Sequence, residues 1–269
     1  MTMTFETFTK LAESYTAIPV SRRILADILT PVSLFLSIRE GADLPFLFES
    51  VEGGERLARY SFLGKNPYQT LRFDGSSVTL QKQNDEPILL AENYFDALER
   101  LTTQHTEPLL QDLPRLTGGA VGFSSYDTVR EVEDLPNTPE NDVDLPEAIW
   151  SFYDEVFAFD HVKQQVVLMK TVFVDESTDL EASYRSAEQA LDMMEETATS
   201  ARPTSKPFHL DADQLTSNIT PETFHNNVKK AKEYIFEGDI FQVVLSQRFE
   251  IPFEGDRFTL YRALRMVNP

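Results

Sequence analysis

The stretch from Asn218 to Phe249, NITPETFHNNVKKAKEYIFEGDIFQVVLSQRF, carries the clearest local pattern in this chain. Thr220 is suited to cap a helix, and Pro221 fits the first helical position, where no backbone N–H is needed. Gly238 is suited to end the helix because glycine accepts a positive φ at little cost. Between them, apolar side chains recur on one helical face, at Phe224, Val228, Ala231 and Ile235. The stretch therefore predicts a well-capped helix.

A strand is predicted directly after this helix, from Asp239 to Phe249. Its side chains alternate between two faces, and one face carries Ile240, Gln242, Val244 and Ser246. Gln242 is polar among apolar neighbours, so on a buried strand its amide needs a partner from the protein or from a ligand. By periodicity alone, the unit is an ordinary helix–turn–strand.

The exact sequence of this stretch also resembles a segment of a known enzyme family. GDIFQVVLSQRF, preceded by the helical KAKEYI, resembles the segment that opens the chorismate-binding domain of the anthranilate synthase component I family. That family converts chorismate and ammonia to anthranilate in tryptophan synthesis. The resemblance implies that Gln242 lies near C2 of chorismate. In water-adding relatives, the isochorismate and salicylate synthases, a Lys that activates water occupies the matching place. Gln cannot act as that base, which suits ammonia as the nucleophile.

A second segment, PFLFESVEGGERLARYSFLG from Pro45 to Gly64, predicts a β-hairpin turning at Gly53-Gly54. It resembles the family's (L/F)LES…RYSF pattern, which forms part of the feedback pocket for L-tryptophan. The resemblance implies that Ser50 meets the polar head of the amino acid, with Glu49 beside it to pair with the ammonium group. Three further residues would line or support this pocket: Arg59, Tyr60 and Ser61.

The same resemblance extends to Val267-Asn268-Pro269, which matches the opening of a family motif that completes the tryptophan pocket. Asn268 is therefore a further expected pocket residue. Phe48 stands where many family members have Leu, a change that is expected to alter the shape or the affinity of the pocket.

Composition sets the outer bounds of function. The chain has 44 Asp and Glu against 24 Lys and Arg, a net charge of −20, which disfavours nucleic acids and anionic lipid surfaces. It has no cysteine, which excludes thiol nucleophiles, thiolate metal sites and disulfides, and which suits a reducing cytosol. Neither an apolar membrane-spanning run nor a secretory signal pattern is present. We therefore expect a cytoplasmic protein with no membrane association.

The one glycine-rich run, GGAVGFSSYDTVR from Gly118 to Arg130, lacks the spacing of phosphate-binding loops. It resembles the family's GGxVGYxxYDxVR pattern and is expected to serve packing. The chain's four histidines are scattered and show no metal-ligand spacing: His105, His161, His209 and His225. No metal site is therefore expected in these residues.

Patterning elsewhere predicts a helix over Phe5–Tyr15, a strand over Val32–Ile38, and an acidic helix over 179–196. Two long strands, Trp150–Phe159 and Gln165–Val174, are predicted to pair as a hairpin. The resemblance implies an α+β fold with largely antiparallel, sandwich-like sheets and peripheral helices. We expect a tryptophan-sensing domain over residues 1–200, a linker over 201–216, and an incomplete chorismate-binding domain over 217–269.

The resemblance covers the N-terminal half of the family's pattern. It implies that the Mg²⁺ ligands and the remaining catalytic residues lie beyond Pro269, and that residues 1–269 alone are inactive. The full enzyme would be a lyase that uses Mg²⁺ and takes ammonia from a glutamine amidotransferase subunit, component II. Two alternatives stay open: a non-catalytic module that senses tryptophan or docks the amidotransferase, and aminodeoxychorismate synthase component I. VVLS at 243–246 favours anthranilate synthase over the latter, where VNL is more usual.

Overall fold

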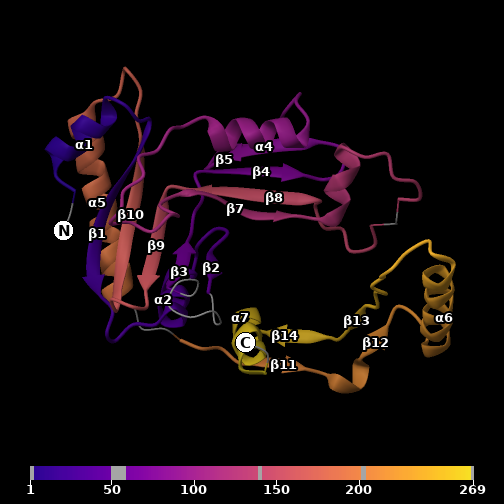
Figure 1. Cartoon of the computed structure of the whole chain (residues 1–269). Helices are drawn as coiled ribbons and strands as arrows, with labels where there is room; N and C mark the ends of the chain where they lie inside the picture. Colours follow the sequence, from indigo (N-terminus) through magenta and orange to yellow (C-terminus); the bar gives the residue numbers. More distant parts are fainter. Residues whose placement is uncertain (1–2, 50–58, 139–140, 201–203, 268–269) are drawn as a thin grey trace. The chain divides into compact units, whose positions relative to one another are not determined.

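A computed structural model describes residues 3–49, 59–138, 141–200 and 204–267. The chain divides into two compact units, Met1–Pro203 and Thr204–Pro269 (Figure 1). The division falls within the segment 201–216, for which a linker was expected. Part of that segment, however, is built into the second unit as two short strands.

The first unit contains two five-stranded antiparallel sheets. Sheet A has the order β1-β10-β9-β3-β2, formed by Ala17–Leu25, Gln165–Phe173, Glu155–Asp160, Tyr60–Gly64 and Phe46–Phe48. Sheet B has the order β6-β5-β4-β8-β7, formed by Ile88–Leu89, Val78–Lys82, Gln69–Phe73, Ala148–Tyr153 and Gly119–Ser124. The predicted pairing of the FLF and YSFLG segments is confirmed, with Phe48 opposite Phe62.

The prediction of one strand from Trp150 to Phe159 is wrong. β8 ends at Tyr153 in sheet B, and β9 begins at Glu155 in sheet A. Asp154 lies between them, where its carboxylate binds Lys170 at 2.7 Å and its carbonyl accepts the amide of Thr171, also at 2.7 Å. The runs on either side of Asp154 are both mostly apolar and buried, so the pattern predicts one continuous strand. The sequence does not show that the two halves join different sheets. The pairing of β9 with β10 is confirmed.

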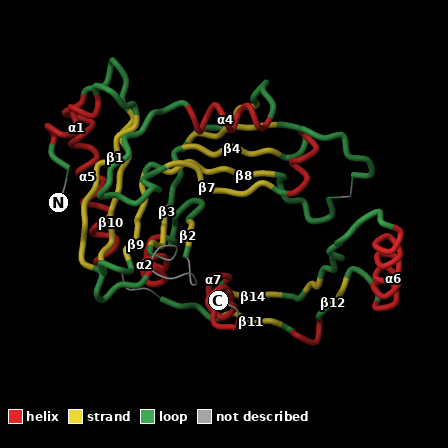
Figure 2. Tube along the Cα trace, in the orientation of Figure 1, coloured by secondary structure: helices red, strands yellow, loops and turns green. Residues whose placement is uncertain are grey.

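Helices cover the outer faces of the two sheets (Figure 2). On sheet A these are α1, Phe5–Ala12, and α5, Leu180–Ser200, with α2, Pro31–Ile38, beside β2 and β3. On sheet B, α4, Tyr94–Thr103, packs over a core made of Leu71, Phe73, Val78, Leu80, Tyr94, Ala97, Leu101, Ala148 and Phe152. A 3₁₀ turn, Tyr126–Glu131, follows β7. The expected α+β fold with antiparallel sheets and outer helices is confirmed.

The inner face of sheet A carries a second core. It joins residues of sheet A to residues from the β7–β8 side of sheet B: Phe46, Val156, Ala158, Val167 and Met169 with Val121 and Tyr153. The strands of the two sheets run across each other (Figure 1). This core is what makes the two sheets one unit, because it buries apolar surface from both.

The predicted strand at Val32–Ile38 is wrong, because these residues form the helix α2. Thr30 caps it by accepting the amide of Ser33 at 3.0 Å, while the Ser33 hydroxyl accepts the amide of Thr30 at 2.9 Å. Pro31 occupies the first turn, and Leu34, Phe35 and Ile38 are buried. A short apolar run fits a buried helix as well as a strand, and the reciprocal cap decides in favour of the helix.

The second unit consists of two strand pairs and two helices. β11, Phe208–Leu210, pairs with β14, Phe253–Gly255, and β12, Thr216–Ser217, pairs with β13, Phe249–Glu250. The helices are α6, Pro221–Glu237, and α7, Arg257–Val267, with a 3₁₀ turn at Ala212–Gln214. The predicted α6 is confirmed, with Thr220 accepting the amide of Thr223 at 3.1 Å and Gly238 at φ 87°.

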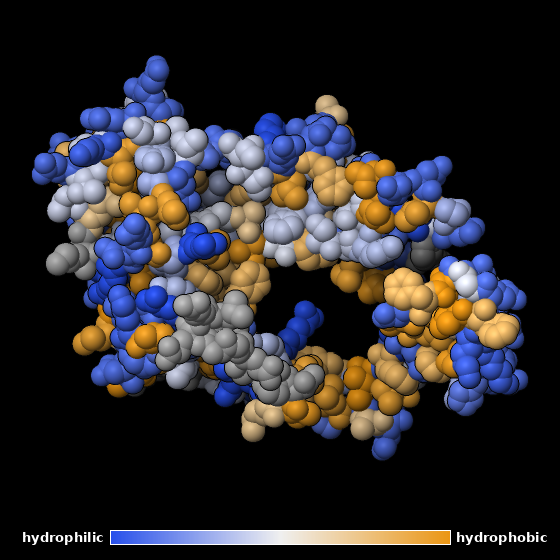
Figure 3. Space-filling view, viewed as in Figure 1, coloured by the Kyte–Doolittle hydropathy of each residue, from blue (hydrophilic) through white to orange (hydrophobic). Residues whose placement is uncertain are grey.

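The strand predicted after α6 is wrong over most of its length, since residues 240–248 form no strand and only Phe249 joins β13. A strand needs a neighbour for its backbone hydrogen bonds. Within the described part of this unit, the neighbouring strands are two or three residues long and are paired elsewhere. Phe241 is consequently 93% exposed and Val244 84% exposed. Apolar side chains gather on the surface of this unit, as the orange atoms over α6 show (Figure 3).

Of the helices in the described residues, none has both the length and the apolar character needed to cross a membrane.

Candidate functional site

Some of the residues predicted to form the tryptophan pocket lie on or beside strands β2 and β3. Glu49 follows β2 directly and is half-buried. β3 pairs with β9, which sets Tyr60 opposite Asp160 and Ser61 opposite Phe159. Two of the six predicted pocket residues, Ser50 and Asn268, lie outside the described residues.

Arg59 is bound to Asp160, the last residue of β9. Its Nη2 lies 2.7 Å from Asp160 Oδ2, and its Nε lies 3.2 Å from Oδ1. The carboxylate, 1% exposed, also accepts the amides of Val162 and Lys163 at 3.1 Å each. Burial acts to raise the pKa of Asp160, but the hydrogen bonds from Arg59 and the two amides outweigh it, so the pKa lies below its ordinary value. Asp160 therefore holds Arg59 as a charged, bidentate partner.

Ser61 is bound to the turn that follows β9, through His161. The Ser61 hydroxyl, on a residue 1% exposed, lies 2.8 Å from His161 Nε2. The His161 amide donates to the Arg59 carbonyl at 2.9 Å, and its ring packs against Phe159 with centroids 4.9 Å apart. The Asp160-His161 turn thus fixes both Arg59 and Ser61.

Tyr60 faces the opposite side of the sheet from Ser61 but stays in contact with Arg59. Successive strand side chains point to opposite faces, and Tyr60 packs beside the core of the inner face, with its ring centroid 5.9 Å from that of Phe62. The Arg59 guanidinium carbon lies 4.8 Å from the centre of the Tyr60 ring, within cation–π range. The structure therefore joins Arg59 and Ser61 through one turn and places Tyr60 on the other face of the sheet.

Sequence reasoning missed Asp160 and His161 as partners of this hairpin. Their only signal was their place between two predicted strands. Their contact with residues 59 and 61 depends on the β3–β9 register, which joins positions about a hundred residues apart.

Gln242, the residue expected near the reacting carbon of chorismate, is exposed within the second unit. It lies in the segment without regular structure between α6 and β13. The end of that segment is anchored, since Gln247 Nε2 donates to Ser217 Oγ and the Arg248 amide donates to Asn218 Oδ1, both at 2.9 Å. The unit by itself gives Gln242 no buried polar surrounding.

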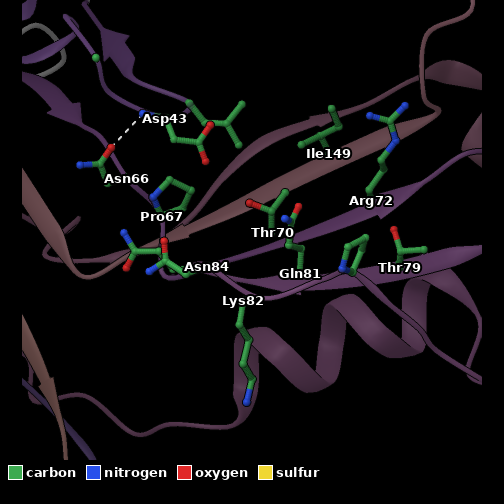
Figure 4. A pocket seen from close by; sticks show the side chains of 14 residues that line it. Asp43, Asn66, Pro67, Thr70, Arg72, Thr79, Gln81, Lys82, Asn84 and Ile149 are labelled. Atoms are coloured by element: carbon green, nitrogen blue, oxygen red, sulfur yellow. Dashed lines mark hydrogen bonds between the residues drawn. The ribbon is translucent and has the colours of Figure 1, made fainter.

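A groove of about 560 Å³ opens on sheet B beside the loop that carries Asp43. Asn66 Oδ1 accepts the Asp43 amide at 2.8 Å, the bond drawn in Figure 4. The two basic side chains that line the groove, Arg72 and Lys82, point in different directions (Figure 4). Because its charged groups do not converge, the groove offers no constellation for catalysis.

In the ranges that the structure describes, no three His, Asp or Glu side chains converge on a point that could hold a metal ion. The described residues therefore do not fit a Mg²⁺ site, and we derive no step through Mg²⁺.

The comparison with known families decides what these elements belong to. The family described as chorismate binding enzyme matches residues 45–269. The chain belongs to the chorismate-binding enzyme family. The match crosses the boundary between the two units at residues 203 and 204.

Individual members of the chorismate-binding family support the assignment. Anthranilate synthase component 1 of Acetivibrio thermocellus is 39% identical over 96% of this chain and 53% of its own length. The Synechocystis protein of the same name is 36% identical over 98% of this chain and 54% of its own length. The crystal structure of anthranilate synthase component I from Streptococcus pneumoniae TIGR4 matches with a TM-score of 0.61 and 27% identity, covering 92% of this chain and 53% of that one. The chain thus spans about half the length of the curated relatives it matches.

The glycine-rich run of this chorismate-binding family member has a packing role. A Cβ at Gly122 would lie 1.9 Å from the carbonyl oxygen of Ile149, because β7 and β8 approach closely there. A Cβ at Gly118 would lie 2.9 Å from Thr171 Oγ1. Phe123, at the position where the resembled pattern carries Tyr, lies in β7 and is 45% exposed.

Proposed function

We propose that this chain is part of an anthranilate synthase component I, which converts chorismate and ammonia to anthranilate and pyruvate in tryptophan biosynthesis. The observation that carries the proposal is the 39% identity to a protein of that name over 96% of the chain. The reaction adds ammonia at C2 of chorismate with loss of the C4 hydroxyl and then eliminates pyruvate, which makes the enzyme a lyase.

Gln242 is proposed to lie beside C2 of chorismate in the whole protein. A neutral amide donates and accepts hydrogen bonds but does not remove a proton from water at neutral pH. A nucleophile that needs no strong base, ammonia, suits such a residue. Mg²⁺ would supply charge compensation for the substrate's carboxylates, and its ligands are proposed to lie outside residues 1–269. We accordingly propose that residues 1–269 alone do not form anthranilate.

Component II, a glutamine amidotransferase subunit, is the proposed source of ammonia, and the cytoplasm is the proposed site of the reaction. The acidic composition and the absence of cysteine from the sequence are compatible with that location.

Feedback inhibition by L-tryptophan is proposed to act at the β2–β3 hairpin, with residues 1–200 as the sensing domain, 201–216 as a linker and 217–269 as the start of the chorismate-binding domain. Ser50 and Glu49 are the proposed contacts of the amino acid's polar head, with Asn268 completing the pocket. Arg59 and Ser61 support them through their bonds to Asp160 and His161. A carboxylate beside the effector's ammonium group supplies a charge-assisted hydrogen bond.

The test is the formation of anthranilate, followed by its fluorescence, from chorismate, an ammonium salt and Mg²⁺. The natural gene product is compared with a protein of residues 1–269 alone. Anthranilate from the former, inhibited by L-tryptophan and supported by glutamine only when component II is present, is the expected result. Chromatographic identification of aminodeoxychorismate would assign the other synthase instead. A natural product with no activity on chorismate, yet with tryptophan or component II bound, would establish a non-catalytic module.

A further inference from the structure

A small cavity of about 180 Å³ opens at the surface of the first unit. It opens between the end of α4, the start of β7 and the end of β10. Its walls are Ala17, Tyr68, Leu101, Thr102, His105, Glu107, Gly118, Gly119, Ala120, Phe152, Tyr153, Thr171 and Phe173. Sites for drug-sized ligands usually measure about 300–1,000 Å³. The volume therefore suits a small molecule.

Aromatic rings form one side of this cavity. The rings of Tyr68 and Phe173 meet edge to face with centroids 5.1 Å apart, and Phe152 lies 6.2 Å from Tyr68. Burial raises the pKa of Tyr68 to about 12, so its phenol is neutral at physiological pH. Neutral aromatic faces carry negative quadrupole charge and attract cations.

His105 closes the aromatic side, with its ring centroid 4.5 Å from that of Phe173. Burial lowers the pKa of His105, so the imidazole is neutral near pH 7 and does not repel a cation. None of the residues that line the cavity is a Lys or an Arg.

Glu107 supplies the one formal charge among these lining residues. Its carboxylate accepts a hydrogen bond from the hydroxyl of Thr117, a buried residue. In the part of the chain that the structure describes, Glu107 forms no ion pair with a basic side chain. Burial raises the pKa of Glu107, and the Thr117 bond opposes this effect only in part. Glu107 as a residue is exposed at the rim of the cavity, so a cation bound in the cavity meets its carboxylate directly.

Three residues of the glycine-rich run form part of the wall: Gly118, Gly119 and Ala120. Gly118 lies so close to β10 and β8 that a Cβ there would meet Thr171 Oγ1, in β10, at 2.9 Å and the Tyr153 carbonyl oxygen, in β8, at 3.0 Å. Gly119 has φ 114°, a conformation that L side chains rarely adopt. The run thus brings bare backbone to the cavity beside the aromatic rings.

We propose that this cavity binds a small organic ammonium cation, with its positive charge against Glu107 and its alkyl groups against the rings of Tyr68 and Phe173. A neutral apolar ligand would make no use of the carboxylate. A hard metal ion would require several oxygen ligands, which an aromatic wall does not provide. Alkylated ammonium is the chemistry that uses both features.

Choline and its neutral carbon isostere, dimethylbutanol, are the probes, because they share a shape and differ in charge. Binding to the full chain is measured by saturation-transfer NMR and by titration at constant ionic strength. The expected result is that choline binds about tenfold more tightly than the isostere. Glu107→Gln, which keeps the hydrogen-bonding shape, is expected to weaken choline about tenfold and leave the isostere unchanged.

Glu133→Gln is the matched control, because Glu133 is exposed, lies after the 3₁₀ turn that follows β7 and does not line the cavity. It should leave both affinities unchanged. Phe173→Leu, which removes an aromatic face but keeps an apolar one, should weaken choline and leave the isostere unchanged. Equal affinities for the two probes, no binding of choline, or equal effects of the two Glu→Gln variants would each overturn the proposal. None of these readouts depends on anthranilate formation.

Discussion

The Arg59 guanidinium binds the Asp160 carboxylate through two bonds, Nη2–Oδ2 at 2.7 Å and Nε–Oδ1 at 3.2 Å. Arg59 precedes β3, and Asp160 ends β9, so the pair fastens the end of the hairpin proposed to sense tryptophan to the centre of sheet A. Because Asp160 is 1% exposed, its carboxylate depends on this partner and on two backbone amides. Several properties of the protein should follow from this contact.

Asp160→Asn should lower the free energy of unfolding by about 1–3 kcal/mol, because the amide cannot replace all the charge-assisted bonds of a buried carboxylate. The measurement is urea unfolding at pH 7. Asp127→Asn is the control, since Asp127 forms a more exposed pair with Arg130 three residues away, at 2.8 Å. That pair should contribute at most about 1 kcal/mol. Equal losses in the two variants would show that the Arg59 contact has no special weight.

Acid stability should depend on the same carboxyl. The pKa of Asp160 is lower in the folded protein than its ordinary value of 3.8, so the unfolded chain takes up its proton first as the pH falls. Its contribution is complete above the ordinary pKa and is lost as the pH falls through the lower, folded pKa. Unfolding free energies measured between about pH 5 and pH 3 should therefore fall less steeply in Asp160→Asn than in the natural sequence. Parallel curves would contradict this assignment.

Ser61 and His161 should be energetically coupled. Their side chains lie 2.8 Å apart, and Ser61 is buried, so removing either partner leaves the other without this bond. A double-mutant cycle with Ser61→Ala and His161→Ala should give a coupling energy of about 1 kcal/mol in urea unfolding. The effects of Thr9→Ala and His161→Ala should be additive, because among the described residues the Thr9 hydroxyl bonds to carbonyls of its own helix α1 and not to His161. Additivity in both cycles would mean that the bond to Ser61 makes no contribution.

Gly122→Ala should disrupt sheet B. An added Cβ would lie 1.9 Å from the Ile149 carbonyl oxygen and 2.8 Å from Trp150 Cα, and backbone atoms cannot yield as a flexible side chain can. We expect a loss above about 3 kcal/mol, or no folded protein. Gly41→Ala is the matched control, because Gly41 has φ 69° with no atom within 4 Å of an added Cβ. It should cost only about 1 kcal/mol, from backbone strain. Thermal unfolding followed by circular dichroism separates the two, and similar losses would refute the close approach of β7 and β8.

The candidate site could be predicted only in part. The LFES and RYSF segments identified the hairpin, and the resemblance to anthranilate synthase component I drew attention to Arg59 and Ser61. The partners of these residues, Asp160 and His161, were hidden because nothing local marks a residue that contacts another about a hundred positions away. Strand alternation could have indicated that Tyr60 and Ser61 face opposite sides of the sheet, once the strand itself was assigned.

What the sequence determined by itself is local. α6 begins after Thr220 and ends at Gly238, as predicted, because its cap bonds and its turn of positive φ involve residues within a few positions of one another. Where a choice depends on distant partners, the tertiary structure decides. Residues 240–248 alternate like a strand yet pair with no strand in the described part of the second unit. The run around Asp154 divides between two sheets. The backbone N–H and C=O groups of a helix form their hydrogen bonds within the same segment. Those of a strand need a partner from another part of the chain, and a local sequence pattern does not show where that partner lies.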